Sequence, residues 1–310
     1  MYNKNMMKDI GEISWVKDYD GTLLEEFLDL YKSRPLRTNQ GGMGINHSYA
    51  LFFILRKLMP NHVIESGVYS GQSTWLIEQA LPHAEIYSLD PVPGFREYTS
   101  SKAKYLLEDF TGLDWSALDA EKTVCFFDDH QSAFSRLKDL KWWGFKHAVF
   151  EDNYPLSQGD CYSLRQVLSG AGHPRPNLTY SSPSGLVASL KEFLKGLLGR
   201  RAMGEINNHV NIKLLEDIYW RQEIIRKPNQ VDRVSAMQNI SVYCEMAPLL
   251  LNKTQRWNDH PWSGEYSLSR DALFGASDEC PALSGCIGDL NRKELISELS
   301  YTYIAYVQLK

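Results

Sequence analysis

The sequence predicts an α/β protein: a doubly wound, mostly parallel Rossmann-like sheet with helices on both faces, an N-terminal helical extension and a helical insertion. Short apolar runs alternate with longer amphipathic stretches between residues 47 and 170, as in consecutive βαβ units. A turn with two glycines follows the first apolar run, and acidic residues follow later runs. Ligands of such sheets bind beyond the carboxyl ends of the strands, so these polar residues are expected to form a site.

Composition excludes several classes of protein. The 310-residue chain is 43% hydrophobic and carries a formal net charge of −5, which favours neither a nucleic-acid partner nor an anionic membrane. No apolar run is long enough to span a bilayer. The five cysteines are odd in number and lack a metal-binding spacing. We therefore expect a cytoplasmic protein with free thiols that acts on a small molecule.

The elements are expected in the following order. Residues 1–45 form an N-terminal extension with a helix over 21–33, and a Rossmann-like domain occupies 46–310. This domain is predicted to contain helix 47–59, strand 62–67, helix 70–81, strand 84–90, a partly helical stretch 96–110, strand 122–129, helix 131–144, strand 146–153 and helix 160–170. The aromatic and β-branched run 301–309 predicts an edge strand or an antiparallel closing strand.

The strand–helix alternation stops between about 170 and 239, where we predict a helical insertion. Its apolar stripe over 186–198 faces away from Lys191 and Lys195. We favour a packing or dimerisation surface, which would make the protein a homo-oligomer. A lid over the active site and a membrane-surface helix are the alternatives.

The first strand leads into a glycine-containing turn, VIESGVYSGQST (63–74). Glu65 ends the strand, and Gly67 and Gly71 follow, a spacing that differs from the dinucleotide motif G-x-G-x-x-G. Bare backbone at a helix N-terminus favours a carboxylate or a phosphate. Asp90 ends the next strand, 23 residues after Gly67, where an acid commonly accepts hydrogen bonds from ribose hydroxyls. A nucleoside with a carboxylate, S-adenosylmethionine, fits both features.

This segment resembles the first motif of class I S-adenosylmethionine-dependent methyltransferases, in particular the metal-dependent O-methyltransferases of the catechol O-methyltransferase type. The resemblance covers about residues 47–170 and includes Tyr69 and Ser73 as well as the glycines. It implies that the cofactor is bound by Glu65, Gly67, Tyr69, Gly71, Ser73 and Asp90. The overall arrangement also resembles the cephalosporin hydroxylase and macrocin O-methyltransferase group, in which acids after the fourth and fifth strands bind magnesium.

Two further strands end in acids, in FFDDHQ (126–131) and VFEDNYP (149–155). Carboxylates that meet in one crevice repel one another unless a cation lies between them. Mg²⁺ takes oxygen ligands, leaves positions open for substrate, and lowers the pKa of a hydroxyl that it binds. We therefore expect a Mg²⁺ or similar divalent site in which Asp128 and Asp152 are catalytic.

The third metal ligand is left open by the sequence. The catechol-type pattern implies Asp128, Asp152 and Asn153, whereas the hydroxylase-like pattern implies Glu151 in place of Asn153. Asp129 is the alternative to Asp128, because a slip of one residue moves a side chain to the other face of a strand. Capping of the following helices would also use acids, but two acidic doublets exceed what capping needs.

The general base is also open. Catechol-type enzymes carry a lysine three residues after the strand acid, and this chain has Gln131 there. His47, His130 and His260 are the candidates, and His130 is also placed to flank the adenine of the cofactor. For His47 and His260, an ordinary core or loop histidine is the alternative interpretation.

Together these patterns indicate a biosynthetic, Mg²⁺-dependent O-methyltransferase that moves a methyl group from S-adenosylmethionine to a hydroxyl of a small or sugar-like acceptor. A hydroxylase or another natural-product tailoring enzyme on the same fold is the first alternative, because fold does not fix chemistry. A non-catalytic cofactor-binding protein is the second, and the intact glycine turn and acid clusters argue against it.

Overall fold

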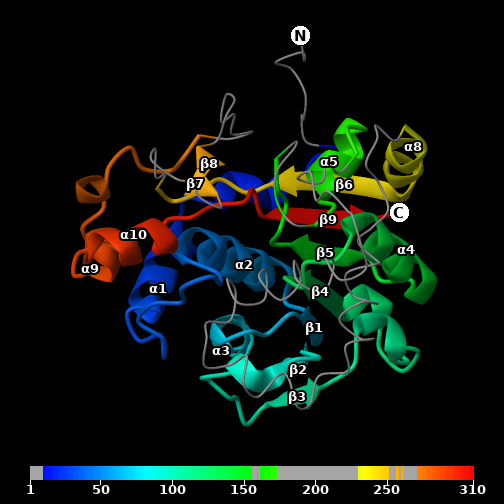
Figure 1. Ribbon diagram of the computed structural model, residues 1–310, viewed down its shortest axis with the longest axis horizontal. Helices are drawn as coiled ribbons and strands as arrows, with labels where there is room; N and C mark the ends of the chain where they lie inside the picture. The colour runs from blue at the N-terminus through cyan, green and yellow to red at the C-terminus, as the bar shows by residue number, and fades with distance from the viewer. Residues whose placement is uncertain are drawn as a thin grey trace, which may run out of the picture.

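The computed structural model describes residues 10–155, 159, 161–172, 230–250, 256–257, 260–261 and 271–310. Its centre is a seven-stranded sheet in the order β3-β2-β1-β4-β5-β9-β6 (Figure 1). The strands are β1 (His62–Ser66), β2 (Glu85–Leu89), β3 (Ala103–Leu106), β4 (Thr123–Phe127), β5 (His147–Phe150), β6 (Ile240–Glu245) and β9 (Ala305–Leu309). The first five are mutually parallel, and β9 is antiparallel to both β5 and β6.

Helices cover both faces of this sheet (Figure 1). They are α1 (Thr22–Tyr31), α2 (Ile45–Leu58), α3 (Gln72–Ala80), α4 (Ala133–Trp143), α5 (Leu164–Ser169), α8 (Gln230–Asn239), α9 (Pro281–Ile287) and α10 (Arg292–Glu298). Short 3₁₀ helices span Ser14–Asp18, Pro93–Phe95, Phe110–Gly112, Ala120–Lys122 and Ser277–Glu279. A separate two-stranded ladder joins β7 (Arg256–Trp257) to β8 (His260–Pro261).

The apolar runs of the sequence arise because the central strands are buried on both faces. In β4, Val124 and Phe126 belong to the core cluster that α1, α2, α3 and α9 cover. Cys125 and Phe127, the alternate residues, belong to the cluster beneath α4, α5 and α8. A strand with two buried faces is a continuous apolar run rather than an alternating one. The predicted fold class is confirmed.

Local signals fix the helix ends near their predicted positions. The Ser132 hydroxyl accepts a hydrogen bond from the backbone N–H of Ser135 and caps the start of α4. Gly144, with a φ of +77°, ends this helix in the left-handed conformation. Ser163 and Gln166 form a capping box at the start of α5.

Three expectations about the elements were wrong or incomplete. Residues 96–110 hold the edge strand β3 rather than part of a helix, because residues 103–106 pair in parallel with residues 86–89 of β2. The strand 301–309 is antiparallel as expected, but it is not an edge, since β6 pairs with its outer side. The sequence analysis missed β6, α9 and α10.

The N-terminal segment and the sheet share one core. Helix α1 packs on α2 and α9, and Phe27 lies in the same cluster as Val63 of β1. Helix α8, the last part of the predicted insertion, packs on α4 and α5. The predicted apolar stripe over 186–198 lies outside the described residues.

Two further observations concern the described part of the chain. None of its helices combines the length and the apolar composition that a membrane span needs. All five cysteines fall within it, and no disulfide joins any two of them.

Candidate active site

The glycine turn after β1 is in direct contact with the loop after β4. Gly67 has a φ of +98°, and a Cβ at this position would lie 1.9 Å from the carbonyl oxygen of Asp128. Gly71 has a φ of +92°, and its Cβ would lie 2.4 Å from the carbonyl oxygen of Tyr98. Only glycine meets both conditions. This close approach brings the first acidic loop beside the glycine turn.

Asp90 is anchored to the same turn. Its Oδ2 accepts a hydrogen bond from the backbone N–H of Tyr69 at 3.2 Å, and its Oδ1 accepts one from Val92 at 2.8 Å. Burial raises the pKa of Asp90, and these hydrogen bonds and the nearby charge of Arg96 oppose the effect. Tyr69 itself has a φ of +49°, a conformation that non-glycine residues adopt mainly at constrained sites. The predicted ribose acid therefore lies beside the predicted cofactor turn.

Glu65 is fully buried beneath the turn. Its Oε2 accepts hydrogen bonds from Thr74 of α3 and Ser88 of β2, each at 2.6 Å. Burial raises the pKa of Glu65, while hydrogen bonds from Ser73, Ser88 and Thr74 act in the opposite direction. Glu65 thus ties α3 and β2 to the end of β1. Ser73 is buried in the first turn of α3.

The loop before α2 also reaches the turn, which the sequence analysis did not predict. Ser70 donates a hydrogen bond to Oδ1 of Asn39 at 2.5 Å, and the hydroxyl of Tyr69 donates to the carbonyl oxygen of Gln40 at 3.2 Å. The signal in the sequence was the polar, glycine-rich run NQGGMG (39–44) directly before the buried helix. Asn39 and Gln40 therefore join the candidate site.

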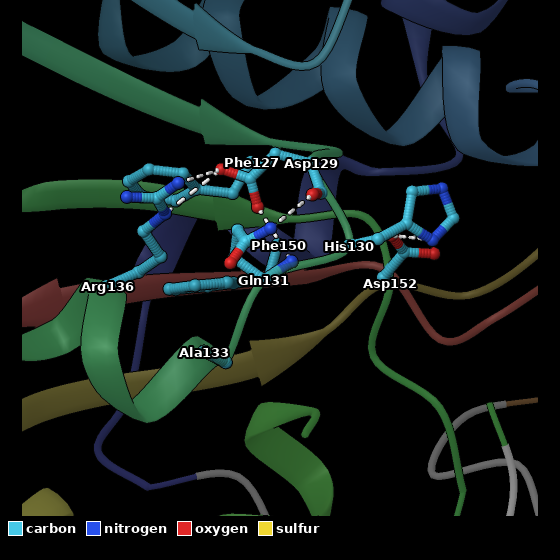
Figure 2. A pocket seen from close by; sticks show the side chains of 8 residues that line it. All are labelled: Phe127, Asp129, His130, Gln131, Ala133, Arg136, Phe150 and Asp152. Atoms are coloured by element: carbon cyan, nitrogen blue, oxygen red, sulfur yellow. Dashed lines mark hydrogen bonds and ion pairs between the residues drawn. The ribbon is translucent and has the colours of Figure 1, made fainter. Parts of the chain in front are cut away.

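Asp128, His130 and Asp152 converge at the carboxyl ends of β4 and β5. One potential ligand atom from each lies within 4.8 Å of the other two. The Nδ1 atom of His130 is 3.5 Å from Oδ2 of Asp152 (Figure 2). The two acidic clusters of the sequence meet because β4 and β5 are neighbouring parallel strands.

The electrostatics of this cluster favour a bound cation. Burial and the charge of Asp152 raise the pKa of Asp128 well above its usual range, although His130 acts in the opposite direction. Burial, Asp128 and Asp152 likewise raise the pKa of Glu151. A divalent ion would offset both the burial of these carboxyl groups and the repulsion between them.

Neither residue that was expected as the third ligand belongs to the cluster of three. Glu151 is buried with its Oε1 3.3 Å from Nδ1 of His47, and a side-chain hydrogen bond joins it to Asp152. It is therefore close to Asp128 and Asp152 without being one of the three clustered residues.

Asn153 is engaged elsewhere. Its Nδ2 donates to the hydroxyl of Tyr243 at 2.9 Å and to the carbonyl oxygen of Tyr303 at 3.0 Å. Its Oδ1 accepts from the backbone N–H of Arg165 at 2.7 Å. The structure does not bring Asn153 together with Asp128 and Asp152.

Asp129, the alternative to Asp128, forms an ion pair with Arg136 instead. Its Oδ2 lies 2.7 Å from Nη2 of Arg136 and accepts a hydrogen bond from the hydroxyl of Ser66 at 2.7 Å. The Arg136 side chain is only 4% exposed and also pairs with Asp109 at 2.6 Å. Asp129 therefore neutralises a buried guanidinium, and Asp128 is the residue that joins the cluster.

A small pocket lies between these two groups of side chains (Figure 2). Phe127 and Phe150, whose ring centroids are 5.2 Å apart, line it together with Gln131, His130 and Asp152. Gln131, which occupies the lysine position of the catechol-type pattern, can form hydrogen bonds but cannot act as a base at neutral pH.

The other two candidate bases are His47 and His260. His47 is 2% exposed, and burial lowers its pKa to about 3. Its Nε2 accepts a hydrogen bond from the backbone N–H of Thr302 at 2.9 Å. His47 is therefore a core histidine held in its neutral form. The side chain of His260 lies outside the described residues.

No protein-family model and no curated protein matches the chain. Solved structures overlap with parts of it. CmcI, in a structure titled with Mg and SAM, is 20% identical over 35% of this chain and 52% of its own, with a TM-score of 0.28. The O-methyltransferase TomG from Streptomyces achromogenes is 17% identical over 62% of this chain and 80% of its own, with a TM-score of 0.31. The methyltransferase PaMTH1 from Podospora anserina is 15% identical over 58% and 80%, with a TM-score of 0.30.

The match spans only about half of the CmcI chain. The fold assignment rests on the strand order and on the packing of both sheet faces.

Proposed function

We propose that the protein transfers the methyl group of S-adenosylmethionine to a hydroxyl of a small or sugar-like acceptor, with a divalent cation bound beside the cofactor. The contact between Gly67 and the carbonyl oxygen of Asp128 is the observation that carries this proposal. It puts the glycine turn directly against the loop that carries the first acid of the cluster, at the carboxyl ends of β1 and β4. A cofactor on the turn would then lie next to an acceptor at the cluster.

Each cofactor residue has a role that follows from its position. Asp90 retains lone pairs on both oxygens beyond its two backbone hydrogen bonds, and these can accept hydrogen bonds from ribose hydroxyls. The backbone N–H groups at the start of α3, after Gly71, can bind the carboxylate of the methionine moiety. The loop carrying Asn39 and Gln40 contacts the turn through the hydroxyls of Ser70 and Tyr69.

The donor set of the cluster fits a divalent cation. Two carboxylates and one imidazole approach within 4.8 Å, and burial together with the charge of Asp152 raises the pKa of Asp128, an effect that a cation would oppose. When bound, such an ion supplies a Lewis acid that lowers the pKa of an acceptor hydroxyl. Asp128 and Asp152 would hold it, and Glu151 would orient Asp152.

A methyl-transfer assay tests the proposal. The purified full-length chain is incubated with S-adenosylmethionine labelled in the methyl group and with a panel of phenolic, sugar and nucleotide-sugar acceptors, with and without a chelator. Transfer of label that stops with the chelator is the expected result. A product that gains one oxygen atom instead of a methyl group would show the hydroxylase alternative. No binding of S-adenosylmethionine by calorimetry would contradict the proposal.

A further inference from the structure

We infer that the cation site takes a nitrogen ligand, His130, and therefore selects first-row transition ions such as Mn²⁺ over Mg²⁺. This inference rests on the proposed function only in treating the cluster of Asp128, His130 and Asp152 as a cation site. It changes the identity of the third ligand and with it the class of metal.

The geometry places the imidazole where a third ligand is required. Nδ1 of His130 is 3.5 Å from Oδ2 of Asp152, and it lies within the 4.8 Å cluster that also includes Asp128 (Figure 2). His130 has a φ of +53°, so the chain turns sharply directly after the acids. Its side chain is 41% exposed, so an ion can reach it from solvent.

The oxygen ligands that would replace His130 are held elsewhere. Both side-chain polar atoms of Asn153 are bonded to groups on the far side of the loop, namely Tyr243, Tyr303 and Arg165. Glu151 is buried against His47, and although the charges of Asp128 and Asp152 both act on it, it does not belong to the cluster of three. Among the described residues, His130 is the donor that completes the set with Asp128 and Asp152.

The donor set then determines the metal. Mg²⁺ prefers six oxygen ligands in a nearly ideal octahedron and gives up its water reluctantly. Imidazole favours transition ions, whose affinities rise from Mn²⁺ toward Cu²⁺ in the Irving–Williams order. A site with one imidazole and two carboxylates should therefore bind Mn²⁺ or Co²⁺ more tightly than Mg²⁺.

Metal titrations of the full-length chain test this without measuring activity. His130→Asn exchanges the nitrogen donor for an oxygen donor, and asparagine tolerates the left-handed backbone of this position. His83→Asn is the matched control, because His83 is exposed at the amino end of β2, away from the cluster. Calorimetry with Mn²⁺ and with Mg²⁺ gives the selectivity, and pulsed electron paramagnetic resonance detects nitrogen coupled to bound Mn²⁺.

We expect the wild type and His83→Asn to bind Mn²⁺ at least about tenfold more tightly than Mg²⁺ and to show nitrogen coupling. His130→Asn should lose the coupling and most of the selectivity. Equal affinity for the two ions, or bound Mn²⁺ without nitrogen coupling in the wild type, would overturn the inference and leave the proposed methyl transfer intact. Failure of the wild type to bind any divalent ion, with S-adenosylmethionine present, would overturn both the inference and the cation in the proposed function.

Discussion

The imidazole of His47 on α2 lies against the carboxylate of Glu151 after β5, with Nδ1 and Oε1 3.3 Å apart and both side chains buried. Because Nε2 of the same ring accepts the backbone N–H of Thr302, the proton of the neutral ring is on Nδ1. Thr302 also donates from its hydroxyl to the carbonyl oxygen of Glu151 at 2.8 Å. Three segments that are distant in sequence therefore hold the residue next to Asp152.

The first prediction concerns this support. His47→Ala should weaken the affinity for Mn²⁺ by roughly tenfold, because groups behind the ligands orient them. It should also lower the free energy of unfolding by about 2–3 kcal/mol, since the ring stacks on Tyr301 and its removal leaves a cavity. Calorimetry and denaturant titration measure the two effects. An unchanged cation affinity would contradict the role assigned to His47.

The same histidine predicts a dependence of stability on pH. Burial lowers its pKa from the usual 6.5 to about 3 in the folded state. The unfolded chain therefore takes up a proton first, and the contribution of His47 to stability is present above pH 6.5 and is lost as the pH falls toward 3. Over this pH range, the free energy of unfolding should fall less in His47→Gln than in the wild type. Both proteins retain Glu151, so the difference between their two curves isolates the histidine.

The second prediction concerns the cofactor. Asp90→Ala should weaken S-adenosylmethionine binding at least about tenfold, because it removes two charge-assisted hydrogen bonds of roughly 1.5–3 kcal/mol each. Asp289→Ala, which removes an exposed acid on the segment between α9 and α10, is the control. Isothermal calorimetry measures both. Equal affinities for the two variants would contradict the assignment of Asp90.

The third prediction concerns the contact between the two loops. Gly67→Ala places a Cβ at 1.9 Å from the carbonyl oxygen of Asp128, in a backbone with a φ of +98°. Both the clash and the strain must be relieved by moving the loops, so cofactor affinity and cation affinity should fall together. In Gly94→Ala, by contrast, the new Cβ meets nothing within 4 Å. Binding titrations of both variants, with thermal unfolding as a control for folding, test the expected difference.

The sequence predicted the scaffold of this site well, because local chemistry determines it. The glycine turn, the acid after β2 and the acids after β4 and β5 each follow an apolar run directly. The apolar runs define the strands, and parallel order brings their ends together. The strand β3 was missed because pairing with β2 outweighed the helical preference of its residues.

The third ligand could not be predicted in the same way. Glu151 and Asn153 flank Asp152 on the same loop, and nothing local distinguishes them. Their orientations depend on distant partners, His47 for Glu151 and Tyr243 and Tyr303 for Asn153. His130 enters the cluster because of its left-handed backbone, which no sequence pattern nearby indicates.

The fourth prediction concerns acid stability. Burial alone would raise the pKa of Asp109, but the hydrogen bond and charge of the Arg136 guanidinium hold it well below its usual range. A carboxyl group with a lowered folded-state pKa contributes stability above its unfolded pKa of about 3.8, and this contribution is lost as the pH falls further. Asp109→Asn should therefore reduce the loss of stability below about pH 4.

Removing the guanidinium is expected to have a larger effect. Arg136→Met leaves Asp109 and Asp129 without their buried partner and should cost about 3–5 kcal/mol near neutral pH. Urea unfolding at several pH values measures both variants. If the free energy of unfolding of Asp109→Asn falls with decreasing pH as steeply as that of the wild type, this ion pair does not control acid stability.

The last prediction separates the ligands from their structural neighbours. Asp152→Ala should abolish turnover and weaken Mn²⁺ binding by at least about a hundredfold, since one of three ligands is lost. S-adenosylmethionine should still bind, because its predicted contacts lie mainly between Gly67 and Asp90. Asn153→Ala should instead cost about 2–4 kcal/mol of stability, because it leaves the buried Arg165 N–H and Tyr303 carbonyl without their side-chain partner.

Among folded molecules, Asn153→Ala should keep its Mn²⁺ affinity within about threefold of the wild type, because a threefold change corresponds to less than 1 kcal/mol. Asp152→Ala should therefore weaken cation binding, whereas Asn153→Ala should lower stability. Denaturant titration measures the stability of each variant, and calorimetry measures its Mn²⁺ affinity. If Asn153→Ala loses the cation while its stability is unchanged, the ligand set is of the catechol type. In that case the side chain of Asn153 must turn toward Asp152, away from Tyr243, when the ion binds.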